Sequence, residues 1–363
     1  MKVLFLSNEY GVDRFGTAYA HRLEDLRCAL QRRGIQTEFL SLREQPVRRP
    51  LLVHPLNLPF IRRNIADCDF IHAGGDAAYT AALLKPFTRA TVIFDVHDDT
   101  FLGAQLVWAA RRDLRRAYWV IQAWIMNAIS YRRADYFLAV AQPLMQRLVD
   151  EKHIPAHRIA LIRNGVDLEL FKPLHHTSNE GFTICYAGGF DAWHGIDLLV
   201  GALELLPKDH VRLKIIGFTE HYAALRSSIA GRLGDRVELL DRVTQKELVS
   251  HLATADALIS PRVRHRATEV MFPSKFSEYL ALGKPVIVCD VDETARLVQQ
   301  HHCGLVSEPS PAAMAETIRA ASNLTQSELH QMGQNARRLA EAEFSWADIG
   351  RKYADLLTRW SAA

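Results

Sequence analysis

The stretch 272–287 reads FPSKFSEYLALGKPVI, which predicts a short helix followed at once by a buried strand. Pro273 suits the first helical turn, where its missing N–H would have no partner, and Gly283 with Pro285 predicts the helix end. Lys275 and Glu278 are three residues apart, so they share one face of this helix. A strand followed by a helix and a second strand is the repeating unit of a parallel α/β sheet.

Lys275 and Glu278 can be interpreted in two ways. Because anions are stabilised at helix N-termini, the lysine could lie near a diphosphate while the glutamate accepts hydrogen bonds from sugar hydroxyls. A nucleotide sugar carries both of these groups. The alternative is an ordinary surface salt bridge between residues i and i+3, which the pair taken alone would favour.

Composition sets the class of protein. With 363 residues, 48% of them hydrophobic and 23% charged, the chain is long enough for two globular domains. Its five cysteines are scattered and never spaced as C-x-x-C, which disfavours a zinc site or a disulfide framework. The apolar run at the start is too short for a signal-peptide core, and the stretch 117–129 is too short to span a bilayer. We therefore expect a cytoplasmic protein that could touch the inner face of the membrane.

Apolar strand segments alternate with helical segments along the whole chain, which predicts an α/β fold with parallel strands and helices on both faces. Strands are predicted at 2–7, 35–40, 69–72, 91–96, 135–140, 159–163, 182–187, 212–216, 236–240, 257–260, 285–289 and 304–306. A polar break near 174–181 separates two such series. We predict two doubly wound, Rossmann-like domains, residues 1–172 and 173–344, facing an interdomain cleft.

In open α/β sheets, ligands bind beyond the carboxyl ends of the strands. After the first strand, Gly16 and Thr17 could let backbone N–H groups approach a phosphate or an acceptor. This segment lacks G-x-G-x-x-G, which disfavours a dehydrogenase. His97 and Asp98 follow the strand at 91–96, and a histidine beside carboxylates at a strand end can bind hydroxyls or move protons. A structural role for His97 is an equal alternative.

Two further strand ends in the second half are candidates. Gly188 and Gly189 follow the strand at 182–187 and permit close approach of the backbone to a ligand, although Gly-Gly is often only a turn. His194 lies at the mouth of the next helix. The loop at 261–269 contains three arginines and no D-x-D motif, so it could neutralise a diphosphate without a metal, or it could be a solvated basic loop.

Taken together, these stretches resemble the retaining glycosyltransferases of family four, the group 1 glycosyltransferases, which have the two-domain GT-B fold. The resemblance covers nearly the whole chain, and its most specific pieces are Asn-Gly-Val-Asp at 164–167 and the opening motif at 273–287. It implies a metal-independent transferase without a cofactor that moves a sugar, with retention of configuration, from a nucleotide-diphosphate sugar to a glycan or lipid-linked acceptor. The setting that it implies is the assembly of a cell-surface polysaccharide or glycolipid.

The resemblance also implies roles for particular residues. The second domain would bind the donor and the first the acceptor, and the last helix, 345–363, would pack back on the first domain. The donor-binding candidates are Gly16, Gly188, Gly189, His194, Arg242, Arg266, Phe272, Ser274, Lys275 and Glu278. The catalytic candidates are His97, Glu269 and Lys275, and the acceptor-side candidates are Thr17, His97 and Asp98.

The sequence departs from the family at two features of the donor site. Many relatives clamp the diphosphate with an arginine and a lysine, whereas this chain has Gly189 and His194 at those places. The usual pair of glutamates is also broken, because the first would fall on Val270 while Glu269 lies one position early. A second hypothesis is therefore a catalytically silent GT-B protein that acts as a binding or partner subunit.

Residues 104–133 predict one long helix or two abutting helices rich in arginine and tryptophan. Basic residues beside tryptophans on an amphipathic helix suit the surface of an anionic membrane. The alternative, which we favour slightly, is that the tryptophans fill the core of the first domain and the arginines are solvated. Nucleic acid is not expected as a partner, because the arginines are spread over an α/β framework without a recognised binding module.

Overall fold

The computed structural model describes residues 1–7, 18–42, 67–97, 99–110, 114–174, 181–208 and 210–362, without the side chains of residues 107, 109, 110, 115 and 116. The chain forms two compact units. The first unit contains Met1–Asn164, Val270–Phe272 and Trp346–Ala363, and the second contains Gly165–Glu269 and Pro273–Ser345.

The first unit is built on a six-stranded sheet in the order β2-β1-β3-β4-β5-β6, with every neighbouring pair parallel. Its strands are β1 (Lys2–Ser7), β2 (Gln36–Ser41), β3 (Phe70–Gly74), β4 (Thr91–Val96), β5 (Tyr136–Ala139) and β6 (Ile159–Leu161). The strand order reverses between β1 and β3, where parallel sheets open a crevice at their carboxyl ends.

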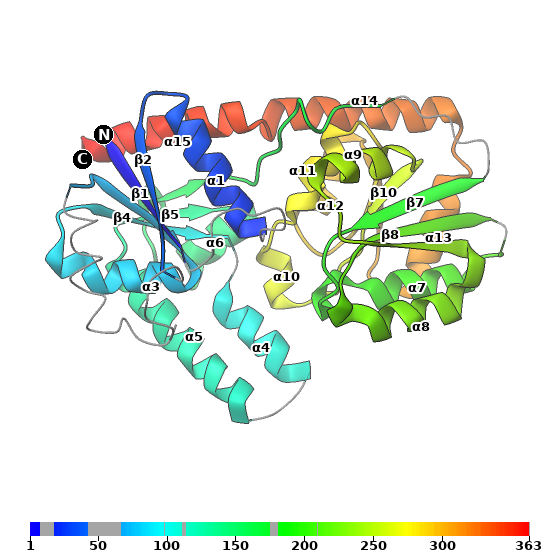
Figure 1. The fold of residues 1–363 in the computed structure, drawn as a ribbon, viewed down its shortest axis with the longest axis horizontal. Helices are drawn as coiled ribbons and strands as arrows, with labels where there is room; N and C mark the ends of the chain where they lie inside the picture. The colour runs from blue at the N-terminus through cyan, green and yellow to red at the C-terminus, as the bar shows by residue number, and fades with distance from the viewer. Residues whose placement is uncertain are drawn as a thin grey trace. The chain divides into compact units, whose positions relative to one another are not determined.

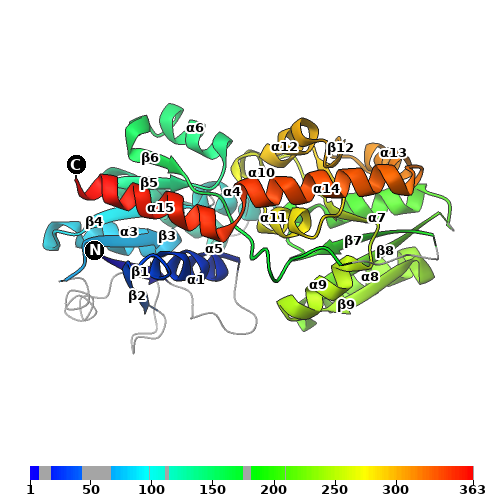
Figure 2. The ribbon, with the colours of Figure 1, turned by 90° about the horizontal axis from the view of Figure 1, so that it is seen from above.

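Helices cover both faces of this sheet. They are α1 (Ala18–Gln31), α3 (Gly75–Leu84), α4 (Thr100–Ala110), α5 (Leu114–Arg133), α6 (Gln142–Asp150) and α15 (Trp346–Ser361). Helices α1 and α15 pack together on one face, and α3 and α5 lie on the other (Figure 1 and Figure 2). The last helix of the chain supplies Ile349, Tyr353 and Leu357 to the same apolar core as Val3 and Phe5 of β1, so α15 is part of this unit.

The second unit has a six-stranded parallel sheet in the order β12-β11-β10-β7-β8-β9. Its strands are β7 (Phe182–Ala187), β8 (Val211–Phe218), β9 (Val237–Asp241), β10 (Ala257–Ser260), β11 (Val286–Cys289) and β12 (Gly304–Ser307). Read from β9, this is the 3-2-1-4-5-6 order of dinucleotide-binding folds, with the reversal between β7 and β10.

The helices of the second unit are α7 (Ile196–Leu205), α8 (Ala223–Leu233), α9 (Gln245–Ala253), α10 (Arg266–Val270), α11 (Ser274–Ala281), α12 (Glu293–His301), α13 (Pro311–Ser322) and α14 (Gln326–Glu343). Helices α7, α8 and α13 lie on one face of the sheet, and α11, α12 and α14 on the other (Figure 1). Helix α10 ends at Val270, which groups with the first unit.

The α/β fold class with two parallel sheets is confirmed, and each of the twelve predicted strands is present. The change of unit falls at 164/165 rather than at the predicted 172/173. Residues 165–174 belong to the second unit because they pack on it: Val166 bridges to Ser345, and Arg337 donates hydrogen bonds to the carbonyls of Leu168 and Phe171.

The stretch 104–133 contributes to two helices, α4 and α5, rather than one. The interpretation that its tryptophans fill the core is wrong, because Trp124 is 59% exposed and Trp119 43%. The buried face of α5 is instead formed by smaller side chains, Ala123, Asn127 and Ser130. Among the described residues, no helix is both long and apolar enough to cross a bilayer.

Candidate functional site

The strongest candidate site lies in the second unit, where β7 and β10 end and the strand order reverses. Gly188 and Gly189 follow β7, and Arg262 follows β10. Lys275 reaches this point from the first turn of α11, which begins one residue after Pro273. The sheet thus brings together residues that are up to 87 positions apart in the chain. Such a switch point is where open α/β sheets bind their ligands.

The glycines are required by the packing around Lys275. Gly188 has φ 140°, and a Cβ atom there would lie 2.5 Å from Lys275 Nζ. A Cβ at Gly217, on the neighbouring strand β8, would lie 2.4 Å from the Gly188 carbonyl oxygen. A side chain at either position would therefore displace the loop or the lysine. We conclude that these glycines allow the lysine to lie directly against the backbone.

Lys275 has an unusual environment for a cation. Its side chain is partly exposed along the stem, but Nζ is covered, lies 4.0 Å from the centroid of the Tyr186 ring, and has no hydrogen-bond partner among the described residues. Burial, and after it the Arg262 charge, lowers the pKa of Lys275 to about 7, although the Glu278 charge opposes both. The interpretation of Lys275 and Glu278 as a surface salt bridge is therefore not supported. A buried ammonium without an anion costs free energy that an anionic ligand would recover.

His194 ends a short 3-10 turn before α7, and Gly195 at φ 68° starts that helix. Burial, with the charges of Lys275 and Arg262, lowers the pKa of His194 to about 2. The imidazole is neutral at pH 7, so it can offer a hydrogen bond but no charge. A Cβ at Gly189 would lie 3.2 Å from His194 Nε2, so the histidine lies against the glycine turn. It does not replace the charge of the missing lysine.

The arginines of the 261–269 loop are not equivalent. Arg262 is buried, and its Nε lies 3.1 Å from the Asp292 carboxylate. Arg264 donates a hydrogen bond to the Asp290 carbonyl and lies 3.3 Å from Glu308. Arg266 is exposed at the first residue of α10. The description as one solvated basic loop is therefore wrong for Arg262, which forms a buried pair.

The other donor-side candidates lie in different settings. Arg242 is exposed just after β9, and Ser274 and Glu278 are half-buried on α11. Phe272 is 4% exposed and groups with the first unit, so its side chain belongs to the packing rather than to an open surface. Its carbonyl accepts a hydrogen bond of 3.2 Å from Asn164 Nδ2.

At the position where the resemblance implies the first glutamate of the pair, the structure has an apolar residue. Val270 is 7% exposed at the end of α10, and the half-buried Glu269 precedes it on the same helix. The two neighbours project about 100° apart around the helix axis, so Glu269 does not point where a glutamate at 270 would. Its catalytic role remains a prediction.

The acceptor-side candidates lie in the first unit. Gly16, Thr17 and Asp98 fall outside the described residues. His97 follows β4 directly, is half-buried, and stacks on Tyr19 with ring centroids 3.9 Å apart. Asp99 is buried and accepts from the Leu102 N–H, 3.0 Å away, at the start of α4.

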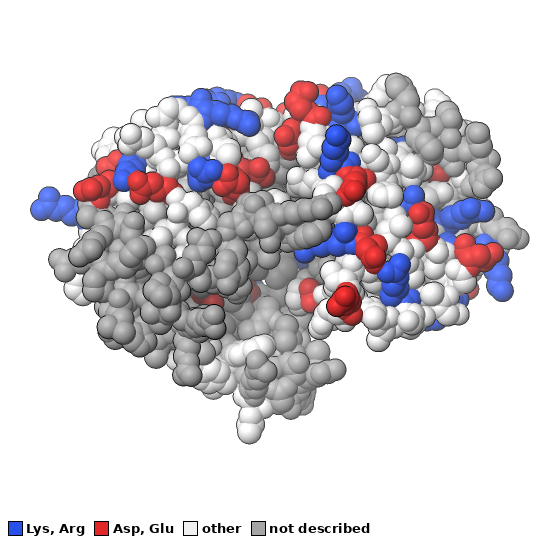
Figure 3. All heavy atoms as spheres, viewed as in Figure 1, with Lys and Arg blue, Asp and Glu red and all other residues white. Residues whose placement is uncertain are grey.

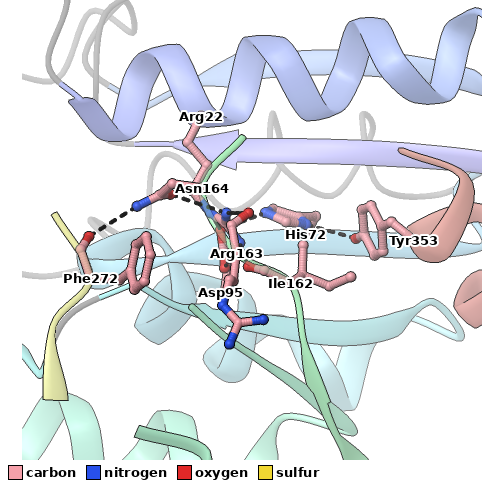
Figure 4. A network of polar contacts seen from close by, with 8 residues as sticks. All are labelled: Arg22, His72, Asp95, Ile162, Arg163, Asn164, Phe272 and Tyr353. Atoms are coloured by element: carbon pink, nitrogen blue, oxygen red, sulfur yellow. Dashed lines mark hydrogen bonds and ion pairs between the residues drawn. The ribbon is translucent and has the colours of Figure 1, made fainter. Parts of the chain in front are cut away.

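A buried polar network that the sequence did not reveal surrounds Asp95, two residues before His97 (Figure 4). Arg22 of α1 holds Asp95 of β4 through two hydrogen bonds of 2.9 Å, and both side chains are almost fully buried. His72 bridges Asp95 and Tyr353, with contacts of 3.2 and 2.7 Å. The pKa of Asp95 is held far below its usual range: burial alone would raise it, but the Arg22 charge and the His72 hydrogen bond outweigh that effect. One feature of the sequence could have indicated this network: Arg22 lies among the apolar residues that form the buried face of α1.

Charge on the surface is mixed. On the face in Figure 3, the described basic and acidic side chains of the second unit lie interspersed. A broad field of one sign would favour a polyanionic partner, and this face has no such pattern among its described residues.

The fold of the two units matches solved glycosyltransferases. Sucrose-phosphate synthase from Thermosynechococcus elongatus superposes with a TM-score of 0.80 at 20% identity, covering 100% of both chains. HepE from Anabaena, solved with UDP and glucose, gives a TM-score of 0.74 at 17% identity, covering 99% of this chain and 100% of the other. At these identities the likeness concerns the fold, which is that of the GT-B class.

Two family models match in sequence. "Glycosyltransferase Family 4" matches residues 19–170, and "Glycosyl transferases group 1" matches residues 181–323. The chain therefore belongs to the family four, group 1 glycosyltransferases, which confirms the resemblance drawn from its motifs.

Curated relatives agree with the family. A putative colanic acid biosynthesis glycosyltransferase, WcaL, from Escherichia coli is 28% identical over 62% of this chain, and the match spans 57% of that protein. The D-inositol 3-phosphate glycosyltransferase of Corynebacterium glutamicum is 25% identical over 77% of this chain and 76% of its own length. The chain thus spans less than two thirds of the Escherichia coli relative.

Proposed function

We propose that this protein is a retaining glycosyltransferase that moves a sugar from a nucleotide-diphosphate sugar to a glycan or lipid-linked acceptor in the assembly of a cell-surface polysaccharide or glycolipid. The environment of Lys275 supports the donor site. Its ammonium group is covered and has no hydrogen-bond partner among the described residues, and it lies beside two glycines at the switch point of the second sheet. A diphosphate supplies the anion that this position lacks. The description of the Escherichia coli relative supports the glycan setting.

The proposed roles follow from these positions. Lys275 contacts the diphosphate, the backbone at Gly188 and Gly189 approaches it, and neutral His194 donates a hydrogen bond. Glu278, one turn after Lys275, accepts from the ribose hydroxyls. The remaining donor candidates, Arg242, Arg266, Phe272, Ser274 and Gly16, line the base, phosphates and sugar. His97, Asp98 and Thr17 serve the acceptor side, and His97 and Glu269 serve catalysis with Lys275.

We also propose that transfer needs neither a metal nor a cofactor. Lys275 and the helix N-terminus at Ser274 supply positive potential where the leaving diphosphate develops charge. Activity that survives chelation with EDTA and gains nothing from Mg²⁺ supports this proposal. Activity that EDTA abolishes and Mg²⁺ restores rejects it. The anomeric configuration of the product, measured by NMR, tests retention.

The donor site is tested by a thermal-shift screen against UDP, GDP, ADP, CMP, dTDP and their common sugar conjugates. We expect one nucleotide to raise the melting temperature, and Lys275→Met and Glu278→Gln to lose that rise, because a ligand that binds only the folded state stabilises it. The matched control is Lys284→Met, which removes a partly buried lysine that precedes β11, away from the carboxyl ends of the strands. It should keep the full response.

Turnover separates the two functional hypotheses. The neutral His194 and the pairing of Arg262 with Asp292 weaken the usual diphosphate clamp, which is the observation behind a silent binding subunit. Chromatography measures whether the protein releases the nucleotide from its sugar conjugate, and such release supports the hypothesis that the protein is an enzyme. Nucleotide binding without any hydrolysis or transfer supports the binding subunit instead.

We also propose that residues 104–133 contact the anionic inner face of the cytoplasmic membrane, where a lipid-linked acceptor would lie. Along α5, Leu114, Tyr118, Ile121 and Ile125 form an exposed stripe at helical spacing, and Leu114 is 91% exposed. Arg132 and Arg133 end the same helix. An apolar face with basic residues at its end suits anionic lipid headgroups.

Vesicle flotation tests this contact. We expect the protein to float with vesicles that contain 30% phosphatidylglycerol and not with pure phosphatidylcholine, and Ile121→Glu to abolish flotation. The matched control is Leu205→Glu, which adds the same charge at an exposed leucine of the second unit, 56% exposed on α7. If both variants float as the wild type does, the stripe does not contact the membrane.

A further inference from the structure

The first turn of α1 meets the end of β4 at His97. The Tyr19 ring lies almost parallel to the His97 imidazole, with centroids 3.9 Å apart and planes inclined by 13°. Stacking of this kind restricts the plane of a ring that would otherwise rotate about its side-chain bonds. Tyr19 thus covers one face of the imidazole.

Gly74 makes room for Tyr19. A Cβ atom at Gly74, the last residue of β3, would lie 2.0 Å from the Tyr19 hydroxyl oxygen, 2.6 Å from the ring carbon that bears it and 2.8 Å from the Asp95 carbonyl oxygen. The phenol therefore occupies the space of the missing side chain. The position of the tyrosine ring is set by the backbone of β3 as well as by its own helix.

One turn along α1, the same helix is anchored to the same strand. Arg22 holds Asp95 with two hydrogen bonds of 2.9 Å, and its guanidinium also donates to the carbonyls of Ile162 and Arg163 (Figure 4). Tyr19 and Arg22 share a helix face, and their partners are Asp95 in β4 and His97, which directly follows β4. The helix therefore meets the strand at two points, and the charged one is deeply buried.

We propose that Tyr19 is a positioning residue for His97: it holds the imidazole in one plane, with Gly74 providing the space and the Arg22–Asp95 pair fixing the helix against the strand. This inference rests on the proposed role of His97 in transfer. Displacement of a reacting group by about 1 Å can cost on the order of a hundredfold in rate, so a residue that fixes a ring contributes to catalysis without touching the substrate.

The test compares Tyr19→Phe, which keeps the ring, with Tyr19→Leu, which removes it, in the full chain with the donor that the nucleotide screen identifies. We expect Tyr19→Phe to retain kcat within about twofold, and Tyr19→Leu to lose at least about tenfold in kcat while its donor KM stays within about twofold. In a His97→Ala background, Tyr19→Leu should cost nothing more, because its effect runs through the histidine. An additive loss in that background overturns the proposal.

A spectroscopic readout keeps the proposal separate from the role of His97. In histidine-labelled protein, the His97 ring protons feel the ring current of Tyr19, so Tyr19→Leu should move them downfield and Tyr19→Phe should not. If His97→Ala keeps the wild-type kcat while Tyr19→Leu moves the His97 signals, the catalytic role of His97 fails and the stacking of Tyr19 on His97 stands. Unmoved signals with unchanged kcat in folded Tyr19→Leu overturn the positioning role.

Gly74→Ala is the second variant, in case Tyr19→Leu fails to fold. It leaves Tyr19 and His97 intact but fills the space of the phenol, so we expect kcat to fall and the His97 signals to move. Combined with Tyr19→Leu, the added methyl should cost less than it does alone. Equal costs in both backgrounds would show that Gly74 acts without Tyr19.

Discussion

Each unit buries a charged side chain near the carboxyl ends of its strands, but the two charges are satisfied differently. In the first unit, Asp95 is held by Arg22 and His72, and Tyr353 completes the network. In the second unit, Lys275 Nζ faces the Tyr186 ring without a hydrogen-bond partner among the described residues. The satisfied charge stabilises the fold of the first unit, whereas a buried charge without a hydrogen bond costs free energy, which the donor diphosphate recovers under the proposed function.

The comparison predicts opposite effects on stability when each charge is removed. Asp95→Asn leaves Arg22 buried without its anion, so we expect the free energy of unfolding to fall by about 3–5 kcal/mol in urea denaturation. The pKa of Asp95 is lowered on folding, so its contribution is present above the unfolded pKa and is lost as pH falls. An unfolding free energy within about 1 kcal/mol of wild type would show that the pair is not structural.

Lys275→Met should do the reverse. Replacing a covered, unpaired ammonium with an apolar side chain of similar length should leave the ligand-free protein as stable as the wild type, or more stable by about 1 kcal/mol. Nucleotide-sugar affinity should fall by about 1.5–3 kcal/mol, because a charge-assisted hydrogen bond is lost. Isothermal titration calorimetry measures the affinity, and urea denaturation measures the free energy of unfolding. A large loss of stability without loss of affinity would show that Lys275 is a structural residue and not a ligand-binding one.

The affinity for the nucleotide sugar should depend on pH through Lys275. Burial and the Arg262 charge lower the pKa of Lys275 to about 7, whereas the pKa of His194 is lowered to about 2, so Lys275 is the one of these two that titrates near neutrality. An anion favours the ammonium form, so affinity should fall as pH rises above about 7, by up to about tenfold per pH unit.

The control for this titration is Lys275→Arg, because a guanidinium keeps its charge throughout the range. Its affinity should stay flat between pH 7 and 9. A nucleotide sugar is the better probe, since its diphosphate does not titrate there. An equally steep fall in the arginine variant would assign the pH dependence to another group.

The smallest effect is expected for an exposed pair in the first unit. Arg351 and Asp348 on α15 lie 2.6 Å apart, three residues apart on the helix surface. Asp348→Asn should change the free energy of unfolding by less than about 1 kcal/mol, because water screens the pair and both side chains lose entropy to form it. A cost near that of Asp95→Asn would show that burial does not explain the difference between the pairs.

Much of the fold was predictable from local pattern. The strands are short apolar runs between turn residues, and such runs in a βα series specify parallel sheets. Strand ends shift by one or two residues: the strand predicted at 212–216 spans Val211–Phe218, because pairing with β7 extends it at its start and pairing with β9 extends it at its end. Lys275 and the paired glycines were named as candidates from the sequence, because strand ends and helix starts identify them, and the structure places Lys275 against Gly188. Their role in donor binding stays a prediction.

The pairing of charges was not predictable, because the partners lie far apart in the chain. Arg22 is 73 residues from Asp95, and His72 is 281 residues from Tyr353. The sequence shows the charged residues but not which of them meet, so Arg262 could be assigned to a phosphate as readily as to Asp292. Tyr19 was missed for the same reason, since stacking on His97 depends on the distant Gly74.

Under the proposed function, Lys275 binds the donor diphosphate, and NMR of the protein labelled at lysine Cε measures this contact directly. We expect one lysine signal, absent in Lys275→Met, to titrate near pH 7 in the free protein, and its pKa to rise by at least about one unit when the nucleotide sugar binds. A Lys275 signal that titrates identically with and without saturating nucleotide sugar would contradict the account.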